Sequence, residues 1–394
     1  TMVNLNSNGV ASHDLEGGIS IEVPDDSAGL ETTDKFQKWA QGATDANDLT
    51  HPSPGGKTPS GRTYDEVVES MKANQGDSTY ANSVVDRVGP KKIATLPMGV
   101  GNYIPYDPVK ETSYDVEKRF SQLFGGVLAT ASQTWDKDKS EKISQAITSS
   151  VTPEEGKENW RYIRYINAML GGHDSDGNHI NDLKFGKDFL VSMGDNLEEL
   201  PWDEIRGYYK EPASSRQVEQ LGQWTTDQWS YDPLSGVLDA MGNNPDAALQ
   251  FLAPYDQGIG DPEVNTSRLD RLLGREWEAD GYSAFTAALA AASSKRSSDS
   301  EAEREAASEV AGRSIHSLAE RKSNISSVGR QDFYCMPHTK ARVGMLLANC
   351  SPEVTQAWNG GNLTDTKYMN RLPSASIDDI NRLTYKVADD ADAT

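Results

Sequence analysis

The segment from Asp174 to Asp182 has the density of oxygen-bearing side chains found in a calcium loop. It reads Asp-Ser-Asp-Gly-Asn-His-Ile-Asn-Asp, with carboxylates at Asp174 and Asp176 and an amide at Asn178. Alternating carboxylates and an amide suit a hard cation that takes about six to eight oxygen ligands. We therefore identify Asp174, Asp176 and Asn178 as candidate metal ligands, with calcium as the candidate cofactor.

The same segment departs from the EF-hand pattern at two positions. An EF-hand loop has a turn glycine and a closing bidentate glutamate where this chain has His179 and Phe185. Any calcium site here would therefore bind weakly. The favoured interpretation is a polar, glycine-rich loop after Gly171-Gly172 that holds no cofactor, in which Asn181 or Asp182 caps the next helix.

The two cysteines, Cys335 and Cys350, leave two states open. A predicted helix of about eleven residues between them would separate them by roughly 16 Å, whereas a disulfide needs Cα atoms about 4.4–6.8 Å apart. Two free, partly buried thiols are therefore favoured over a bridge. Cys335 and His338 are spaced to share a metal, but the sequence supplies no evident further ligands.

Catalytic signatures are missing from the sequence. It contains no nucleophile elbow, phosphate loop, dinucleotide fingerprint or zinc-protease motif. His316 lies in a predicted helix, where a satisfied or solvated histidine is favoured over an acid–base role. With 60 acidic residues, any chosen carboxylate pair is uninformative as a glycosidase signal. We predict no catalytic residue and favour a non-enzymatic protein; the alternative is an enzyme, such as a carboxylate-based hydrolase, whose site leaves no motif.

The aromatic residues have two possible roles, packing in a core and contact with another protein, and the first is favoured. They concentrate between residues 160 and 231, where most would fill a core and an exposed subset would form a docking surface. Trp358-Asn359-Gly360 matches the Trp-x-Gly turn of small secretion substrates, but the helix before it is short. An aromatic anchor at a helix end is the favoured role for Trp358.

The net charge argues against a nucleic-acid partner, and the lengths of the apolar runs argue against a membrane-spanning helix. The 394 residues include 38 basic and 60 acidic side chains, a net charge of −22 that repels phosphate backbones. The longest apolar runs are far short of the roughly 20 residues of a membrane-spanning helix. We therefore expect neither a nucleic-acid partner nor a membrane span. No signal-peptide pattern is visible, and a cytoplasmic or an exported location stays open.

Hydrophobic periodicity predicts an all-α fold. Val116, Phe120, Phe124 and Val127 lie on one apolar stripe that also includes Leu123, Leu128 and Ala131. Another long helix is predicted over about 300–321, and shorter ones include 181–197. Tripeptides such as Asn244-Pro245-Asp246 combine a cap, a proline and an acid at a helix start. The predicted architecture is an irregular multi-helix array with capped helix–turn–helix corners and a flexible N-terminal arm.

Composition divides this array into four segments. Residues 1–62 form a flexible polar arm, within which Ile19–Val23 alternates like a strand and Thr33–Gln41 forms a helical turn. Residues 63–200 and 201–375 form two helical subdomains. Residues 376–394 form a C-terminal helix and an acidic tail.

Several segments resemble a family of uncharacterised actinobacterial helical proteins, classed as a domain of unknown function. They are residues 69–97, 125–135, 232–248 with its Asn-Pro-Asp-Ala-Ala motif, and 341–349. The resemblance covers roughly residues 64–390. Members often lie near type VII secretion or polymorphic-toxin genes, which implies a role through protein contacts in secretion or toxin delivery. A structural component of a larger particle is a further alternative, and the resemblance implies no functional residue.

Overall fold

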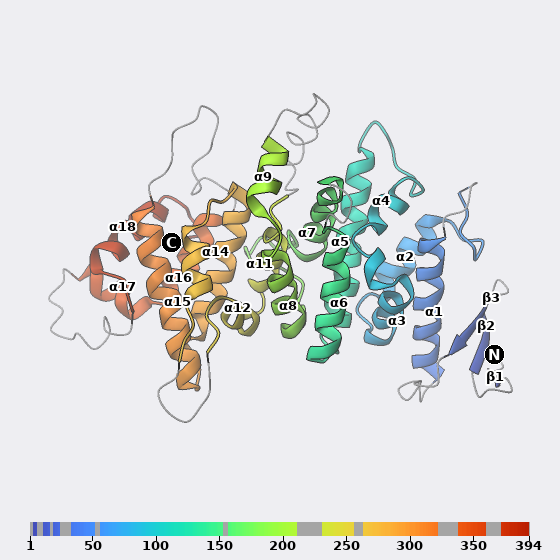
Figure 1. Cartoon of the computed structure of the whole chain (residues 1–394), viewed down its shortest axis with the longest axis horizontal. Helices are drawn as coiled ribbons and strands as arrows, with labels where there is room; N and C mark the ends of the chain where they lie inside the picture. The colour runs from blue at the N-terminus through green and yellow to red at the C-terminus, as the bar shows by residue number, and fades with distance from the viewer. Residues whose placement is uncertain are drawn as a thin grey trace. The chain divides into compact units, whose positions relative to one another are not determined.

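The computed structural model describes ten stretches of the chain, and helices dominate them (Figure 1). The stretches are 3–5, 11–15, 19–23, 33–51, 56–152, 157–210, 231–255, 263–321, 338–359 and 372–393. The prediction of an all-α fold is confirmed. Two compact units, Thr1–Met169 and Leu170–Thr394, divide the chain. The four segments drawn from composition stay a prediction.

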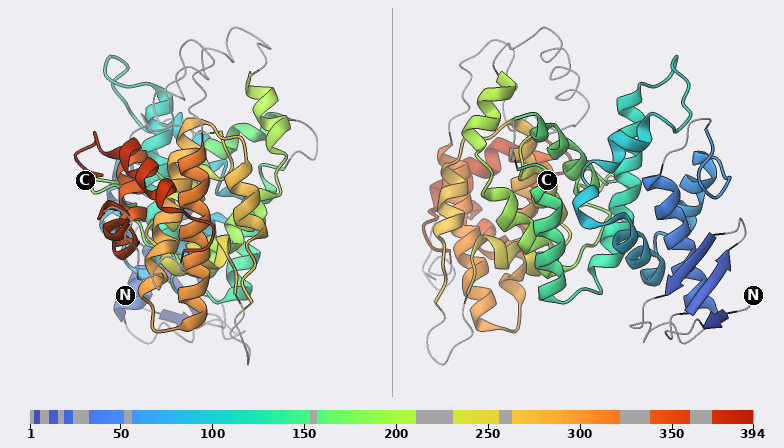
Figure 2. Two further views of the ribbon diagram at one scale, coloured as in Figure 1. Left: turned by 90° about the vertical axis from the view of Figure 1, so that its left-hand side faces the viewer. Right: turned by 45° about the vertical axis from the view of Figure 1, so that its right-hand side comes forward.

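Three short strands form the only sheet among the described residues. β1 (Val3–Leu5), β2 (Ala11–Leu15) and β3 (Ile19–Val23) are antiparallel and pair in the order β1-β2-β3 (Figure 2). His13 lies opposite Ile21 in the register of the second pair. The apolar–polar alternation at Ile19–Val23 therefore does mark a strand.

Helix α1 (Thr33–Thr50) is longer than the predicted turn and lies within the segment expected to be a polar arm. Ala46 and Leu49 are fully buried, and the helix packs against α3. Asp45 and Asp48 are also buried, and Arg62 Nη2 lies 2.7 Å from a carboxylate oxygen of each. Arg62 thus offsets the cost of burying the two carboxylates of this helix.

In the first unit α5, which carries the predicted stripe, packs against α2, α3 and α4. Val116, Phe120, Phe124 and Val127 are buried, as are Leu128 and Ala131, while Leu123 is half-buried. The helices are α2 (Tyr64–Asn74), α3 (Ser78–Val88), η1 (Pro90–Lys92), α4 (Leu96–Gly101), α5 (Ser113–Ser132), α6 (Lys137–Ser149), η2 (Lys157–Tyr162) and α7 (Ile163–Leu170), which ends at the boundary of the units.

The second unit is built around α14, which contacts α11, α12, α15 and α16. Alanine-rich α14 is apolar on most of its surface, as expected of a central helix. The helices are α8 (Lys187–Glu198), α9 (Trp202–Lys210), α11 (Ser235–Met241), α12 (Pro245–Leu252), α13 (Ser267–Gly274), α14 (Ala279–Ser294), η3 (Lys295–Ser297), α15 (Glu301–Glu320), α16 (Thr339–Ala348), α17 (Ser351–Trp358) and α18 (Ile377–Val387).

The capping residues predicted from the sequence are confirmed at α12 and wrong at α8. Asn244 caps α12 by accepting a hydrogen bond from the Ala247 amide, as its motif predicts. The expectation that Asn181 or Asp182 caps the next helix is wrong, because α8 begins at Lys187 with Gly186 at the cap. The residues up to Gly186 instead form an extended loop.

Four further expectations concern membrane spans, the cysteines, the Trp-x-Gly turn and the aromatic residues. Within the described stretches, no helix is both long and apolar enough to cross a bilayer. Cys350 is buried, whereas Cys335 and Gly360 lie outside the described residues, so the disulfide and the Trp-x-Gly turn stay untested. Trp160 and Tyr165 are buried in the first unit and fill its core.

Candidate metal centre

The loop between α7 and α8 is folded by hydrogen bonds from its own side chains. Asp174 Oδ2 accepts from the His179 amide at 3.1 Å, and Asp176 Oδ1 accepts from the Asn178 amide at 3.1 Å. Asn178 Oδ1 accepts from the Ile180 amide at 2.8 Å. Each oxygen-bearing residue thus turns the backbone after it, which draws the side chains of the loop toward one another.

Two residues of the loop adopt left-handed backbone conformations. Gly177 has φ 72°, and His179 has φ 67° where the EF-hand pattern has its turn glycine. By residue type His179 does not match the EF-hand pattern. Its backbone nevertheless takes the conformation that the glycine of the pattern would supply. A left-handed non-glycine residue costs about 1–3 kcal/mol, so surrounding contacts must hold His179 in place.

Carboxylates gather at the centre of the loop. One oxygen from each of Asp174, Asp176 and Asp182 lies within 4.8 Å of the others. Asp182 Oδ2 accepts from the Ser175 amide at 2.7 Å. Asp174 Oδ1 is buried and has no hydrogen-bond partner within the described part of the chain. An unpaired buried carboxylate oxygen is unfavourable and fits best where a cation would compensate it.

A buried anchor closes the two ends of the loop. Asp239 Oδ2, on α11, accepts from the Gly172 amide at 2.9 Å and from Asn181 Nδ2 at 3.0 Å. Arg342, on α16, donates to Asp239 Oδ1 at 2.7 Å and to the carbonyl oxygen of His179 at 3.0 Å. Burial alone would raise the pKa of Asp239, but Arg342 and these donors hold it below its usual value. The loop is therefore fixed by a charged carboxylate.

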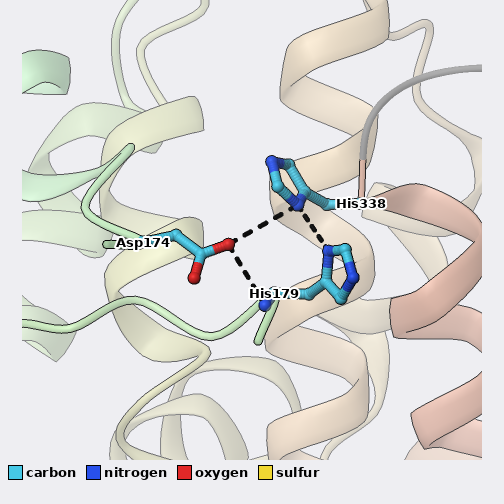
Figure 3. Close-up of side chains that lie close together, drawn as sticks. All are labelled: Asp174, His179 and His338. Carbon is cyan, nitrogen blue, oxygen red and sulfur yellow. Dashed lines mark hydrogen bonds and ion pairs between the residues drawn. The ribbon is translucent and has the colours of Figure 1, made fainter. Parts of the chain in front are cut away.

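A second histidine, from the start of α16, meets the loop (Figure 3). His179 Nδ1 lies 2.6 Å from His338 Nδ1, and Asp174 Oδ2 lies 3.7 Å from the same His338 nitrogen. His338 also has a left-handed backbone, with φ 71°. Burial lowers the pKa of His338, and the Arg342 charge adds to this effect. The close-up shows Asp174 and both imidazoles turned toward a common point.

The structure assembles the predicted residues only in part. Asp174 and Asp176 belong to one cluster, whereas Asn178 donates from Nδ2 to Asp176 Oδ2 at 3.0 Å. Phe185, at the position of the missing closing ligand, is a core residue that stacks on Phe189. Sequence reasoning missed the partnership of His179 with His338. Their separation of 159 residues leaves no local signal.

A carboxylate-based enzyme is expected to hold a carboxylate of raised pKa in a cleft, and the second unit has a cavity beside α8, α9 and α13. This cavity, of about 530 Å³, is lined by residues that include Leu197, Trp202 and Arg271. Burial raises the pKa of Glu117 and of Asp195, but neither residue lines it. Glu117 instead accepts a hydrogen bond from the Tyr165 hydroxyl in the first unit.

Fold and site define an all-helical protein with a candidate cation-binding loop. The chain belongs to a family of unknown function, DUF6571, whose family model matches residues 1–394. This match extends beyond the roughly 64–390 covered by the resemblance. None of the curated proteins and none of the solved structures compared with the chain matches it.

Proposed function

We propose that this protein binds a calcium ion in the loop from Asp174 to Asp182. The observation that carries the proposal is the buried Asp174 Oδ1, which has no hydrogen-bond partner among the described residues and belongs to a carboxylate cluster. A calcium ion would satisfy this oxygen and neutralise the repulsion among the carboxylates of the cluster.

The ligand set is made of oxygens. Asp174, Asp176 and Asp182 would supply carboxylate oxygens, while Asn178 and the Ile180 carbonyl stand at the other positions at which an EF-hand loop supplies ligands. Water would complete the coordination, because buried Phe185 occupies the position of the bidentate glutamate. We expect a dissociation constant of about 10⁻⁴–10⁻³ M, as in weak calcium modules.

The test is calorimetric titration of the full chain with Ca²⁺, and separately with Mg²⁺. Asp176→Asn and Asp182→Asn should each weaken calcium binding at least about tenfold, since each removes a ligand charge. Asp188→Asn is the matched control, because this exposed carboxylate lies on α8 beyond the loop. Calcium binding that is absent in the wild type, or unchanged in both ligand variants, would contradict the proposal.

A second candidate function is docking to another protein. Trp358 on α17 is 67% exposed and Tyr385 on α18 is 86% exposed, and these two helices pack against each other. Exposed tryptophan and tyrosine are the residue types that dominate binding hot spots. The resemblance to actinobacterial proteins encoded near secretion and toxin genes suggests a partner from that machinery.

Affinity capture from cytosol, envelope and medium tests this candidate. Trp358→Ala and Tyr385→Ala should each lose a partner that the wild-type chain retains. Val109→Ala is the control, since Val109 is a 90% exposed apolar side chain in the other unit. A partner set that is identical for the wild type and both aromatic variants would argue against docking through these helices.

A further inference from the structure

One carboxylate oxygen and two imidazole nitrogens converge beside the loop from Asp174 to Asp182. They are Asp174 Oδ2, His179 Nδ1 and His338 Nδ1, and one ligand atom from each residue lies within 4.8 Å of the others. We propose that Asp174, His179 and His338 form a binding site for a divalent transition-metal ion, with zinc as the preferred ion. This site shares Asp174 with the calcium proposal, but its donor chemistry is different and it does not depend on that proposal.

The hydrogen bonding of His179 fixes which of its nitrogens carries the proton and which carries the lone pair. His179 Nε2 lies 2.9 Å from Asp392 Oδ2 in the C-terminal segment. An ionised carboxylate only accepts hydrogen bonds, so Nε2 carries the proton and a neutral His179 has its lone pair on Nδ1. That lone pair faces His338 and Asp174. A histidine oriented through its second nitrogen by a carboxylate is the usual arrangement of a metal ligand.

His338 completes the nitrogen pair from a different element. Its Nδ1 is within 2.6 Å of His179 Nδ1, so without a metal one imidazole must donate to the other. On metal binding the shared proton would leave Nδ1 of His338, whose neutral tautomer would carry its proton on Nε2 instead, and the two Nδ1 atoms would move apart to accommodate the ion.

The backbone supports a specific role for these histidines. His179 and His338 have φ 67° and 71°, a region that favours glycine, yet neither position is a glycine. Each such conformation costs about 1–3 kcal/mol and persists only where neighbouring contacts impose it. Arg342 provides one contact by donating to the His179 carbonyl at 3.0 Å. The two left-handed backbones place the imidazoles of His179 and His338 side by side, which is consistent with a shared role as ligands.

The donor set selects the class of metal. Imidazole nitrogen suits zinc and other transition ions, whereas calcium and magnesium prefer oxygen. Two histidines and one carboxylate fill three positions of a tetrahedral zinc site and leave the fourth for water. Asp174 would take part through Oδ2, so its unpartnered Oδ1 stays available to the carboxylate cluster.

The experiment is zinc titration of the full chain, freed of metal with a chelator and carrying no histidine tag. Calorimetry should give one zinc per chain, and Co²⁺ should produce the visible absorption of a nitrogen-ligated ion. His338→Asn and His179→Asn should each weaken zinc binding at least about 100-fold, and both should remain folded because asparagine tolerates a left-handed backbone. Asp392→Asn should weaken it by about 10- to 100-fold as a positioning residue.

Matched controls make each outcome decisive. His316→Asn removes a histidine that is half-exposed on α15 and bonded to Asp379, and it should bind zinc like the wild type. Asp176→Asn should lose calcium and keep zinc, while His338→Asn should lose zinc and keep calcium, so failure of one proposal is distinct from failure of the other. Absence of stoichiometric zinc binding by the wild type, or wild-type affinity in both histidine variants, would overturn the inference.

Discussion

Arg342 and Asp239 form a buried ion pair that joins α16 to α11 and holds the loop from Asp174 to Asp182. Arg342 Nη2 lies 2.7 Å from Asp239 Oδ1, and side-chain exposure is only 6% and 11%. The same arginine reaches the His179 carbonyl, and the same aspartate binds both ends of the loop. The pair is therefore the structural support of the candidate site.

Removing one partner of this pair should strongly destabilise the second unit. We expect Arg342→Met to lower the free energy of unfolding by about 3–5 kcal/mol, because Asp239 would remain as an uncompensated buried charge. Urea denaturation measures the change. Arg382→Met is the control: its partner is Glu320, both side chains are more than half exposed, and the loss should be at most about 1 kcal/mol. Equal losses would contradict a supporting role for Arg342.

The substitution His179→Gly should weaken zinc binding while leaving calcium binding nearly unchanged. Glycine adopts the left-handed backbone without steric strain, so the calcium loop should keep its shape. We expect calcium affinity to stay within about threefold of the wild type, equivalent to about 0.6 kcal/mol. Zinc affinity should fall at least about 100-fold because an imidazole is lost. Parallel titrations with the two ions check this, and a variant that retains full zinc affinity would exclude His179 as a ligand.

Glu117 should make the stability of the first unit fall as pH rises. Burial raises its pKa above the usual 4.5, although the Tyr165 hydroxyl and Arg164 oppose this shift. The folded chain then binds the proton more tightly than the unfolded chain, so this contribution is full below the unfolded pKa and is lost as pH rises through the folded pKa. The slope can reach about 1.4 kcal/mol per pH unit.

Glu117→Gln removes this titration and isolates its effect. The free energy of unfolding of the wild type, minus that of the variant, should decrease as the pH rises above 4.5, the usual pKa of a glutamate. Urea denaturation across that range measures the difference. A difference that is constant or increases with pH would show that the carboxylate is not destabilised in its ionised form.

Cys350 should react slowly with thiol reagents in the folded protein. Burial raises its pKa to about 11, although the nearby Arg296 opposes the shift. The thiolate is the reactive form, so little of it exists at neutral pH. In a Cys335→Ser background, we expect modification of Cys350 to be at least about 100-fold slower in the folded chain than in urea. Comparable rates would indicate that the thiol is accessible.

Local pattern was sufficient for much of the helical framework. The apolar stripe from Val116 to Ala131 corresponds to α5, and the pattern over about 300–321 corresponds to α15 (Glu301–Glu320). Both helices satisfy their periodicity within a single segment, so sequence spacing alone predicts them. α1 was underestimated because its buried face is made of small residues and of Asp45 and Asp48, whose burial depends on Arg62.

The sequence by itself determined the oxygen-rich loop, because Asp174, Asp176 and Asn178 are neighbours whose side chains turn their own backbone. Only the tertiary structure decided what surrounds it. His338 lies 159 residues beyond His179, and Asp392 lies 213 residues beyond it. Packing of α11, α14 and α16 brings these segments together, and contacts at such separations leave no periodic trace in the chain.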